Sequence, residues 1–252
     1  VDTHSNKCLW LEEQHFSNVL RGEQLVHQLE LIYDEHDFLR AGFWQRIRVS
    51  VKNQYFTLLP NSLFYKDNAR QYLKLASRHL PESYEVLNYR HPHSEIVNVF
   101  AAEREVVEWF RRVYPAKHVG FVHHSSALIE GVLNTDAAVL QSVSILVESS
   151  HLTILVATGQ RLDYCNTFYY VNAQDFLYYT MLVFSELQLS THVHKVMLYG
   201  EISPESAIFE YLQRYINNVG FGNKPSMIKF GFYFDEVYDH RYFDVYNIHL
   251  CE

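Results

Sequence analysis

The chain has 252 residues, 48% hydrophobic and 20% charged, which predicts an ordinary globular core in one large or two average domains. With 21 basic and 29 acidic residues, its formal net charge of -8 argues against a nucleic-acid partner, because phosphate binding needs a basic face. No apolar run approaches the roughly 20 residues of a membrane span, so we predict no membrane insertion.

The three cysteines are far apart in the sequence. Cys8, Cys165 and Cys251 form neither a CxxC pair nor a disulfide framework, which predicts a reducing, cytoplasmic setting. At the start of the sequence, residues 1–4 have the pattern of a turn entered from an upstream strand. The sequence therefore predicts that further residues precede Val1.

The first predicted elements are a short strand at residues 7–13 and an amphipathic helix or irregular segment at 23–36. Residues 45–52 alternate between polar and apolar side chains and face residues 55–59 across a tight turn. This is the pattern of a β-hairpin whose turn is Asn53-Gln54.

A helix with one apolar face follows at residues 69–76, and Asp67 is its expected cap. Residues 84–89 and 95–101 then predict a second antiparallel pair of strands. The first half of the chain is therefore rich in strands.

Helical spacing of apolar residues runs from 102 to 113, with glutamates in the first turn, arginines in the last, and Pro115 as a stop. A strand at 118–123 and a short helix at 125–133 follow. Residues 134–136 are the predicted domain boundary.

The second half opens with a β-turn-β unit. Two apolar runs, 145–147 and 152–156, flank the polar residues 148–151, and a third strand is predicted at 161–171. Asn172 has the position of an N-cap, with Asp175 three residues later as in a capping box. The helix that follows, at 174–189, is apolar nearly all round, so we expect it to be buried on most sides. The remaining predicted elements are a strand at 195–199, a helix from Ser203-Pro204 to Val219, and strands at 227–234 and 243–249.

The two halves have a similar order of elements, in which strands are followed by helix, strand and helix. This order predicts an α/β fold with mixed sheets, built from two ribonuclease-H-like domains in tandem. The first would span residues 1–135 and carry a strand-rich insertion at about 17–101, and the second would span 136–252. Such a pair is the actin-like ATPase architecture.

Several segments carry a resemblance to a known family. They are NKCLWLEE (6–13), FTLLPNSLF (56–64), DFLYYTMLVFSELQL (175–189), LYGEI (198–202) and FDVYNIHLCE (243–252). In these segments the chain resembles an uncharacterised bacterial family of unknown function to which an actin-like ATPase fold is assigned. Its layout is also similar to that of pilus-assembly proteins with actin-like cytoplasmic domains. The resemblance implies a fold without implying a reaction.

Actin-like ATPases hold phosphates with two hairpins of the type Asp-x-Gly-x-Thr, in which glycine lets backbone N–H groups approach the phosphate. The turn in the second half offers Glu148, Ser149 and Ser150, an acid and two hydroxyls without a glycine. The turn at residues 2–7 also lacks glycine, and the adenosine side has the single Gly200 between Tyr199 and a glutamate.

Glu148, Ser149, Ser150 and Gly200 are the candidate cofactor-binding residues, on the condition that the chain has kept nucleotide binding. The other interpretation is an ordinary polar turn and a strand-to-helix junction. We therefore expect no cofactor, and Mg-ATP only if the alternative function below is correct. Catalytic residues are not identifiable from the sequence.

Histidine pairs raise the question of a metal. His192 and His194 would share a side in a strand, but no third ligand and no HExxH spacing accompany them, so no metal site is predicted. Ser125, next to His123 and His124, is interpreted as a helix cap in preference to a nucleophile, and Cys165 as a buried, inert thiol.

Two functions remain. The first is a non-catalytic, protein-binding scaffold in the bacterial cytoplasm, with degenerate nucleotide motifs and an unidentified protein partner. The alternative is an ATP-binding phosphotransferase or ATPase with atypical phosphate loops.

Overall fold

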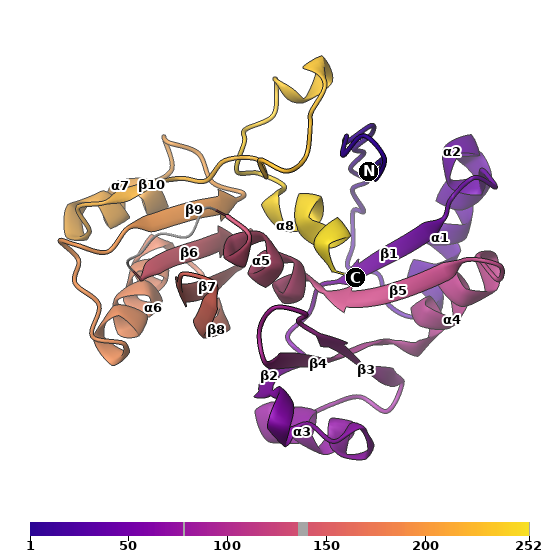
Figure 1. The fold of residues 1–252 in the computed structure, drawn as a ribbon, viewed down its shortest axis with the longest axis horizontal. Helices are drawn as coiled ribbons and strands as arrows, with labels where there is room; N and C mark the ends of the chain where they lie inside the picture. The colour runs from indigo at the N-terminus through magenta and orange to yellow at the C-terminus, as the bar shows by residue number, and fades with distance from the viewer. Residues whose placement is uncertain (78, 136–140, 252) are drawn as a thin grey trace. The chain divides into compact units, whose positions relative to one another are not determined.

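The computed structural model describes residues 1–77, 79–135 and 141–251. Contacts divide the chain into two compact units (Figure 1). The larger unit comprises Val1–Trp10 and Ala127–Glu252, and the smaller unit comprises Leu11–Ser126. The predicted boundary at 134–136 ends on Asp136, which lies outside the described residues. The division at residue 135 stays a prediction.

The larger unit is built on a five-stranded sheet in the order β10-β9-β6-β7-β8. Its strands are β6 (Ser142–Val147), β7 (His151–Thr158), β8 (Arg161–Tyr169), β9 (Val196–Gly200) and β10 (Val219–Phe221). The first three form an antiparallel meander, whereas β9 runs parallel to β6 and β10 runs parallel to β9. The predicted hairpin and its third strand are confirmed. Nearly every residue of β6 and β7 is buried, as their continuous apolar runs require.

Helices α6 (Ala173–Glu186) and α7 (Ala207–Tyr215) follow β8 and β9 in the chain. Asn172 caps α6 as predicted, because its Oδ1 accepts a hydrogen bond of 2.9 Å from the Asp175 N–H. We predicted that α6 is buried on most sides; Phe176, Thr180, Val183 and Phe184 are buried, but Tyr178 (62% exposed) and Leu182 (36% exposed) place one face of the helix in solvent. Both predicted ends of α7 were also wrong. Ser206 is the N-cap, and Val219 belongs to β10, whose pairing with β9 removes these residues from the helix.

The chain ends in short helical turns and not in the predicted strands. The observed elements are the 3₁₀ helix Phe232–Phe234, helix α8 (Phe243–Tyr246) and the 3₁₀ helix Asn247–Leu250. The strand predicted at 7–13 was wrong as well, because within it only Lys7 makes a β-bridge. Aromatic residues favour strands only where a sheet receives their side chains. Here Phe243 packs instead against the Tyr199 ring of β9, with 4.1 Å between centroids.

The smaller unit contains two sheets, and the hairpin predicted at residues 45–59 was wrong. Strand β1 (Arg46–Val51) pairs in parallel with β5 (His118–His123), while β2 (Phe56–Pro60) and β3 (Tyr84–Arg90) pair on either side of β4 (Ile96–Glu103). Asn53 directs the chain from one sheet to the other. Its Nδ2 donates to the Ala101 carbonyl and its Oδ1 accepts from the Tyr55 N–H, both at 2.8 Å.

Five α-helices begin in the described part of the smaller unit. They are α1 (Glu23–Glu35), α2 (Asp37–Arg40), α3 (Ala69–Ala76), α4 (Arg104–Val113) and α5 (His124–Leu133). The N-cap of α3 is Asn68, so the prediction that Asp67 caps this helix was wrong. Asp67 lies in the 3₁₀ turn Lys66–Asn68. A second 3₁₀ turn spans Asn61–Leu63. Leu73 of α3 packs with Val97 and Val99 of β4 in an apolar cluster. Across the described residues, none of the helices has both the length and the apolar character needed to cross a bilayer.

Candidate functional site

The candidate residues of the second half gather at the ends of two neighbouring parallel strands. Val147, the last residue of β6, pairs with Gly200, the last residue of β9. Glu148 comes next in the chain after Val147 and therefore lies close to Gly200. The Glu201 N–H donates to the Val147 carbonyl at 2.7 Å, which holds the two strand ends together. Ligands of α/β sheets commonly bind at the carboxyl ends of parallel strands. The structure therefore places Glu148 and Gly200 together, with Ser149 and Ser150 in the adjoining turn.

The turn itself closes on its own backbone. The Glu148 N–H donates to the His151 carbonyl at 2.9 Å, and the Ser150 carbonyl accepts from the Tyr170 N–H at 3.0 Å. Among the described non-glycine residues, positive φ occurs only at Asn6 and Gln188, so Ser149 and Ser150 are not left-handed. A phosphate nest of the αR-αL type contains a left-handed residue, which turns successive N–H groups toward one point. This turn does not have the geometry of such a nest.

Gly200 is required by the packing of the backbone around it. Its φ of +86° lies in the left-handed region, and a Cβ atom would come within 2.2 Å of the Val147 carbonyl oxygen. Its N–H donates to the His240 carbonyl at 2.9 Å, and the His240 Nε2 lies 2.7 Å from the Ile202 carbonyl oxygen. The Gly200 amide is therefore engaged by the C-terminal part of the chain, and the glycine has a structural explanation.

The charges at the strand ends are negative. Burial raises the pKa of Tyr170, and the carboxylates of Glu201 and Glu148 raise it further. The Tyr170 hydroxyl donates to the Glu148 carbonyl oxygen. Two carboxylates this close to the turn would repel a triphosphate that arrived without a cation. The residues present do not fit Mg-ATP in the manner of the Asp-x-Gly-x-Thr hairpins.

In the N-terminal turn, the carboxylate of Asp2 is hydrogen-bonded within the turn itself. Asp2 and Lys7 exchange backbone hydrogen bonds of 2.9 and 3.1 Å. The Asp2 carboxylate accepts from the Ser5 hydroxyl and the His4 N–H, and these two hydrogen bonds lower its pKa. Asp2 thus stabilises the turn locally.

The histidine pairs do not combine into a metal centre. His192 and His194 lie in a turn and not in a strand; His192 Nδ1 is 3.0 Å from the Asn217 amide, and His194 Nδ1 accepts from the Ser190 N–H at 2.8 Å. In the described ranges, no group of three or more His, Cys, Asp or Glu side chains is arranged to hold a metal ion.

Among the described histidines, His123 has the pKa that is shifted furthest from its ordinary value. Its Nε2 lies 2.9 Å from the Asn53 carbonyl oxygen and its Nδ1 2.7 Å from the Ser125 hydroxyl. The ring stacks on Phe56, and its burial lowers its pKa to about 3. His123 is therefore neutral, with its proton on Nε2, where the carbonyl requires a donor.

Ser125 meets one geometric criterion of a nucleophile, because it lies within hydrogen-bond distance of an oriented histidine. However, its side chain is fully buried, and the Asn98 amide nitrogen lies 2.9 Å from its Oγ and 2.8 Å from the Ser126 Oγ. A substrate has no access to this oxygen, so the network is structural. Burial likewise raises the pKa of Cys165 to about 12, which agrees with an unreactive thiol.

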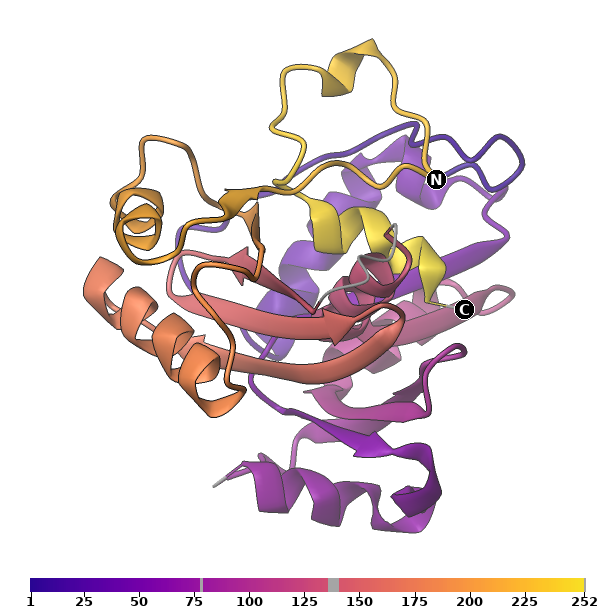
Figure 2. The same cartoon turned by 60° about the vertical axis from the view of Figure 1, so that its left-hand side comes forward.

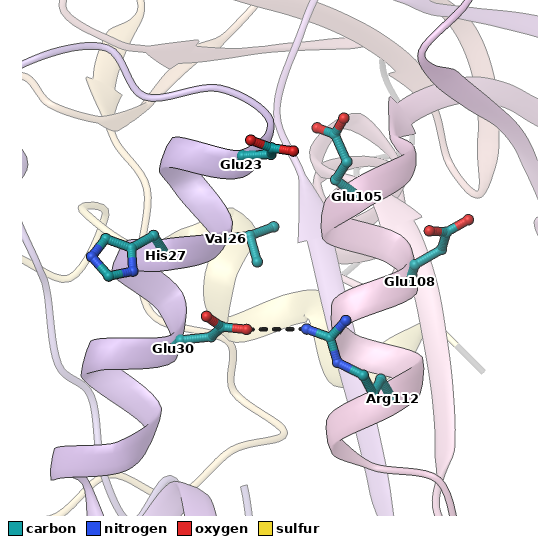
Figure 3. Close-up of a pocket in the computed structure, with 7 residues that line it drawn as sticks. All are labelled: Glu23, Val26, His27, Glu30, Glu105, Glu108 and Arg112. Atoms are coloured by element: carbon teal, nitrogen blue, oxygen red, sulfur yellow. Dashed lines mark hydrogen bonds and ion pairs between the residues drawn. The ribbon is translucent and has the colours of Figure 1, made fainter.

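A cavity in the smaller unit was not predicted from the sequence. It has a volume of about 300 Å³ and runs between α1 and α4 (Figure 3). Four glutamates, one arginine, one histidine and one valine line it: Glu23, Glu30, Glu105, Glu108, Arg112, His27 and Val26. Their spacing by three, four or seven residues along each helix is the signal that would have identified it. Only Glu30 and Arg112 form an ion pair across it, at 3.0 Å, so the groove suits basic groups and repels phosphates.

A protein-family match described as "Protein of unknown function (DUF3822)" covers residues 1–219. The chain belongs to this family. The family predicted from the resemblance is thereby confirmed as one of unknown function with an actin-like ATPase fold. No curated protein matches this DUF3822 chain.

Solved structures show the fold of this DUF3822 protein. A protein of unknown function with an actin-like ATPase fold from Bacteroides thetaiotaomicron VPI-5482 matches with a TM-score of 0.77 and 19% identity, over 98% of this chain and 87% of the other. The PilM–PilN type IV pilus biogenesis complex matches with a TM-score of 0.53 and 12% identity, over 90% and 84%. The AlfA filament from B. subtilis plasmid pLS32 matches with a TM-score of 0.42 and 12% identity, over 94% and 72%. The first two establish a mixed α/β, actin-like ATPase fold.

Proposed function

We propose that this DUF3822 protein is a non-catalytic, actin-like scaffold of the bacterial cytoplasm, and that it acts by binding a protein partner. One observation carries the proposal. At the end of β9 the Gly200 N–H is bonded to the His240 carbonyl, and its side-chain position is filled by the Val147 carbonyl oxygen. The strand end therefore has no glycine amide free to approach a nucleotide, and the neighbouring turn has no left-handed residue to form a nest.

The fold part of the proposal is a tandem of ribonuclease-H-like domains, residues 1–135 and 136–252. It is supported by the larger unit, in which the antiparallel meander β6-β7-β8 is followed by α6, β9, α7 and β10. In the first half α4, β5 and α5 follow one another as helix, strand and helix, in the same order as α6, β9 and α7 in the second half. The proposed strand-rich insertion at about 17–101 holds α1, α2, β1, β2, α3, β3 and most of β4, which ends at Glu103.

The partner part of the proposal is supported by the likeness to PilM, which was solved in a complex with PilN. A fold of this kind therefore serves as a protein-binding unit in at least one other protein. Reproducible co-purification of one protein with the tagged chain from its native cells is the expected result, and repeated recovery of none would contradict it.

The nucleotide part is tested by thermal unfolding with and without millimolar Mg-ATP. A ligand present at 100 times its Kd stabilises a protein by about 2.7 kcal/mol, which would raise the melting temperature by about 5–10 °C in a chain of this size. We expect no rise. A rise of that size would favour the alternative, an ATP-binding phosphotransferase or ATPase, for which the adjacency of Glu148 and Gly200 at the strand ends is the supporting observation.

A further inference from the structure

The segment between β10 and α8, residues 222–242, presents aromatic side chains to solvent. We refer to it as the aromatic segment. In both Figure 1 and Figure 2 it extends away from the sheet of the larger unit and returns to α8. Phe232 and Tyr233, which begin its 3₁₀ helix, are 80% and 90% exposed. Adjacent rings with this exposure are unusual, because large apolar side chains gain free energy when they leave water.

The aromatic segment is held in place from inside. Lys224 donates to the Phe234 carbonyl at 2.7 Å, forms an ion pair with Asp239 at 2.9 Å and lies 5.7 Å from the centroid of the Phe230 ring. Phe234 is buried, and the Phe230 ring packs edge-on against Tyr246 of α8, with 4.8 Å between centroids. A loop of this length without sheet or long helix is commonly functional.

This anchoring gives the exposed rings a fixed position. The 3₁₀ turn is closed by hydrogen bonds from the Phe234 N–H to the Gly231 carbonyl and from the Asp235 N–H to the Phe232 carbonyl, each of 3.0 Å. Because the backbone is already ordered, a partner would lose little further conformational entropy on binding here. Rigid aromatic side chains are the residues that dominate binding energy at protein interfaces.

The charge around the rings specifies the partner. Between residues 230 and 238 the charged side chains are Asp235 and Glu236, and both are exposed. Earlier in the segment, Lys224 is engaged by Asp239 and Lys229 is exposed. Exposed aromatic faces beside carboxylates attract guanidinium and ammonium groups, through cation–π contacts and ion pairs. A second copy of the chain is disfavoured, since each copy carries a formal charge of -8. Anionic lipid and nucleic acid are disfavoured for the same reason.

We propose that Phe232, Tyr233, Asp235 and Glu236 form a docking surface for a protein segment in which arginine or lysine alternates with apolar residues. The apolar residues and the cation would pack on the two rings, and the two carboxylates would pair with the basic groups. The proposal deepens the proposed function, on which it rests for the existence of a protein partner, by naming the surface and the chemistry of that partner.

The experiment uses a random peptide display library as the probe, selected on the 252-residue chain. We expect the selected peptides to be rich in arginine and apolar residues, and to bind Phe232→Ala and Tyr233→Ala at least about tenfold more weakly. The paired charge reversal Asp235→Lys with Glu236→Lys should have a similar effect, and raised salt should weaken binding. Because these side chains are exposed, all variants should keep the melting temperature of the wild type.

Matched controls come from the same unit. Tyr178→Ala removes an exposed ring of α6, and Glu205→Lys reverses an exposed charge, so both should bind the peptides as the wild type does. Selection of no peptide, selection of peptides without basic residues, or equal binding by all variants would overturn the proposal. A dimer that Phe232→Ala dissociates in sedimentation analysis would also overturn it, in favour of a second copy.

The two proposals fail separately. A rise in melting temperature with Mg-ATP, together with weakened peptide binding by Phe232→Ala, would overturn the non-catalytic function and leave this surface standing. Equal peptide binding by all variants without any effect of Mg-ATP would remove the surface alone.

Discussion

The two compact units reach their stability by different means. In the larger unit the central strands β6 and β7 are apolar and buried on both faces, and they form one cluster with residues of α6 and β9. In the smaller unit no residue of β1 is fully buried, and the buried side chains include a polar network of Asn98, His123 and Ser125. Apolar burial is independent of protonation, whereas a buried histidine links folding to pH. The larger unit also holds His249, whose pKa burial lowers, but His123 is fully buried and its pKa is lowered to about 3. Stability of the smaller unit should therefore depend on pH more strongly than that of the larger.

The largest expected effect is the acid sensitivity contributed by His123. Its folded pKa of about 3 lies below the ordinary value of 6.5, so the unfolded state binds the proton first. The stabilisation is complete above about pH 6.5 and is lost as the pH falls toward 3, at about 1.4 kcal/mol per pH unit and about 5 kcal/mol in total. Urea unfolding of the wild type and His123→Gln from pH 4 to pH 7 measures it.

His123→Gln should lower the free energy of unfolding at pH 7 and flatten its dependence on pH. His249, whose pKa burial also lowers, is present in both proteins and cancels in the difference. Parallel pH profiles for the two proteins would show that His123 is not the linked group.

A matched pair of isoleucines compares the two sheets directly. Ile145 in β6 is fully buried, whereas Ile47 in β1 is half-buried. Ile145→Ala should cost about 4 kcal/mol, because it removes apolar contacts and leaves a cavity, and Ile47→Ala about 1 kcal/mol. Chemical denaturation gives both values, and equal losses would contradict the difference drawn between the sheets.

Gly200 tests the close backbone approach at the strand ends. Gly200→Ala should destabilise the protein by about 3 kcal/mol, since the new Cβ would meet the Val147 carbonyl oxygen at 2.2 Å and φ is +86°. Gly220→Ala in β10 is the control, because a Cβ there has nothing within 4 Å. Thermal unfolding should distinguish the two variants, and a tolerated alanine at Gly200 would refute the packing explanation for this glycine.

The smallest expected effect concerns helix capping in the two units. Asn172→Ala removes the side chain that accepts from the Asp175 N–H at the start of α6 and should cost about 1 kcal/mol. Asn68 is the N-cap of α3 but makes no side-chain cap bond, so Asn68→Ala should change stability by less than about 0.5 kcal/mol. Urea titration of both variants checks the contrast, which would disappear if the two losses were the same.

The sequence predicted elements wherever local pattern and final pairing agree. The β6–β7 hairpin, the β3–β4 pair, α4 and the Asn172 cap are specified by neighbouring residues, and all were confirmed. The β1–β2 hairpin was wrong because β1 pairs with β5, about 70 residues away, and nothing in the turn at Asn53 indicates that pairing. The strands expected at 227–234 and 243–249 were wrong, because the aromatic side chains of these residues lie around α8 or on the surface and not in a sheet.

In the candidate site, too, the features set by neighbouring residues were predictable and the long-range contacts were not. The adjacency of Glu148 and Gly200 was implicit in the predicted strands, since both follow a strand of one sheet. The bond from the Gly200 N–H to His240 was not predictable, because it joins residues 40 positions apart through an irregular segment. The α1–α4 groove was missed because the two helices lie far apart in the sequence, with about 70 residues between them.

We propose that the strand ends at Glu148 and Gly200 do not hold a triphosphate. Amide chemical shifts of the isotope-labelled chain, followed during a titration with Mg-ATP to millimolar concentration, test it most directly. We predict no saturable change at the N–H groups of Ser149, Ser150 and Gly200. Saturable shifts of these amides, absent from a titration with magnesium alone, would contradict it.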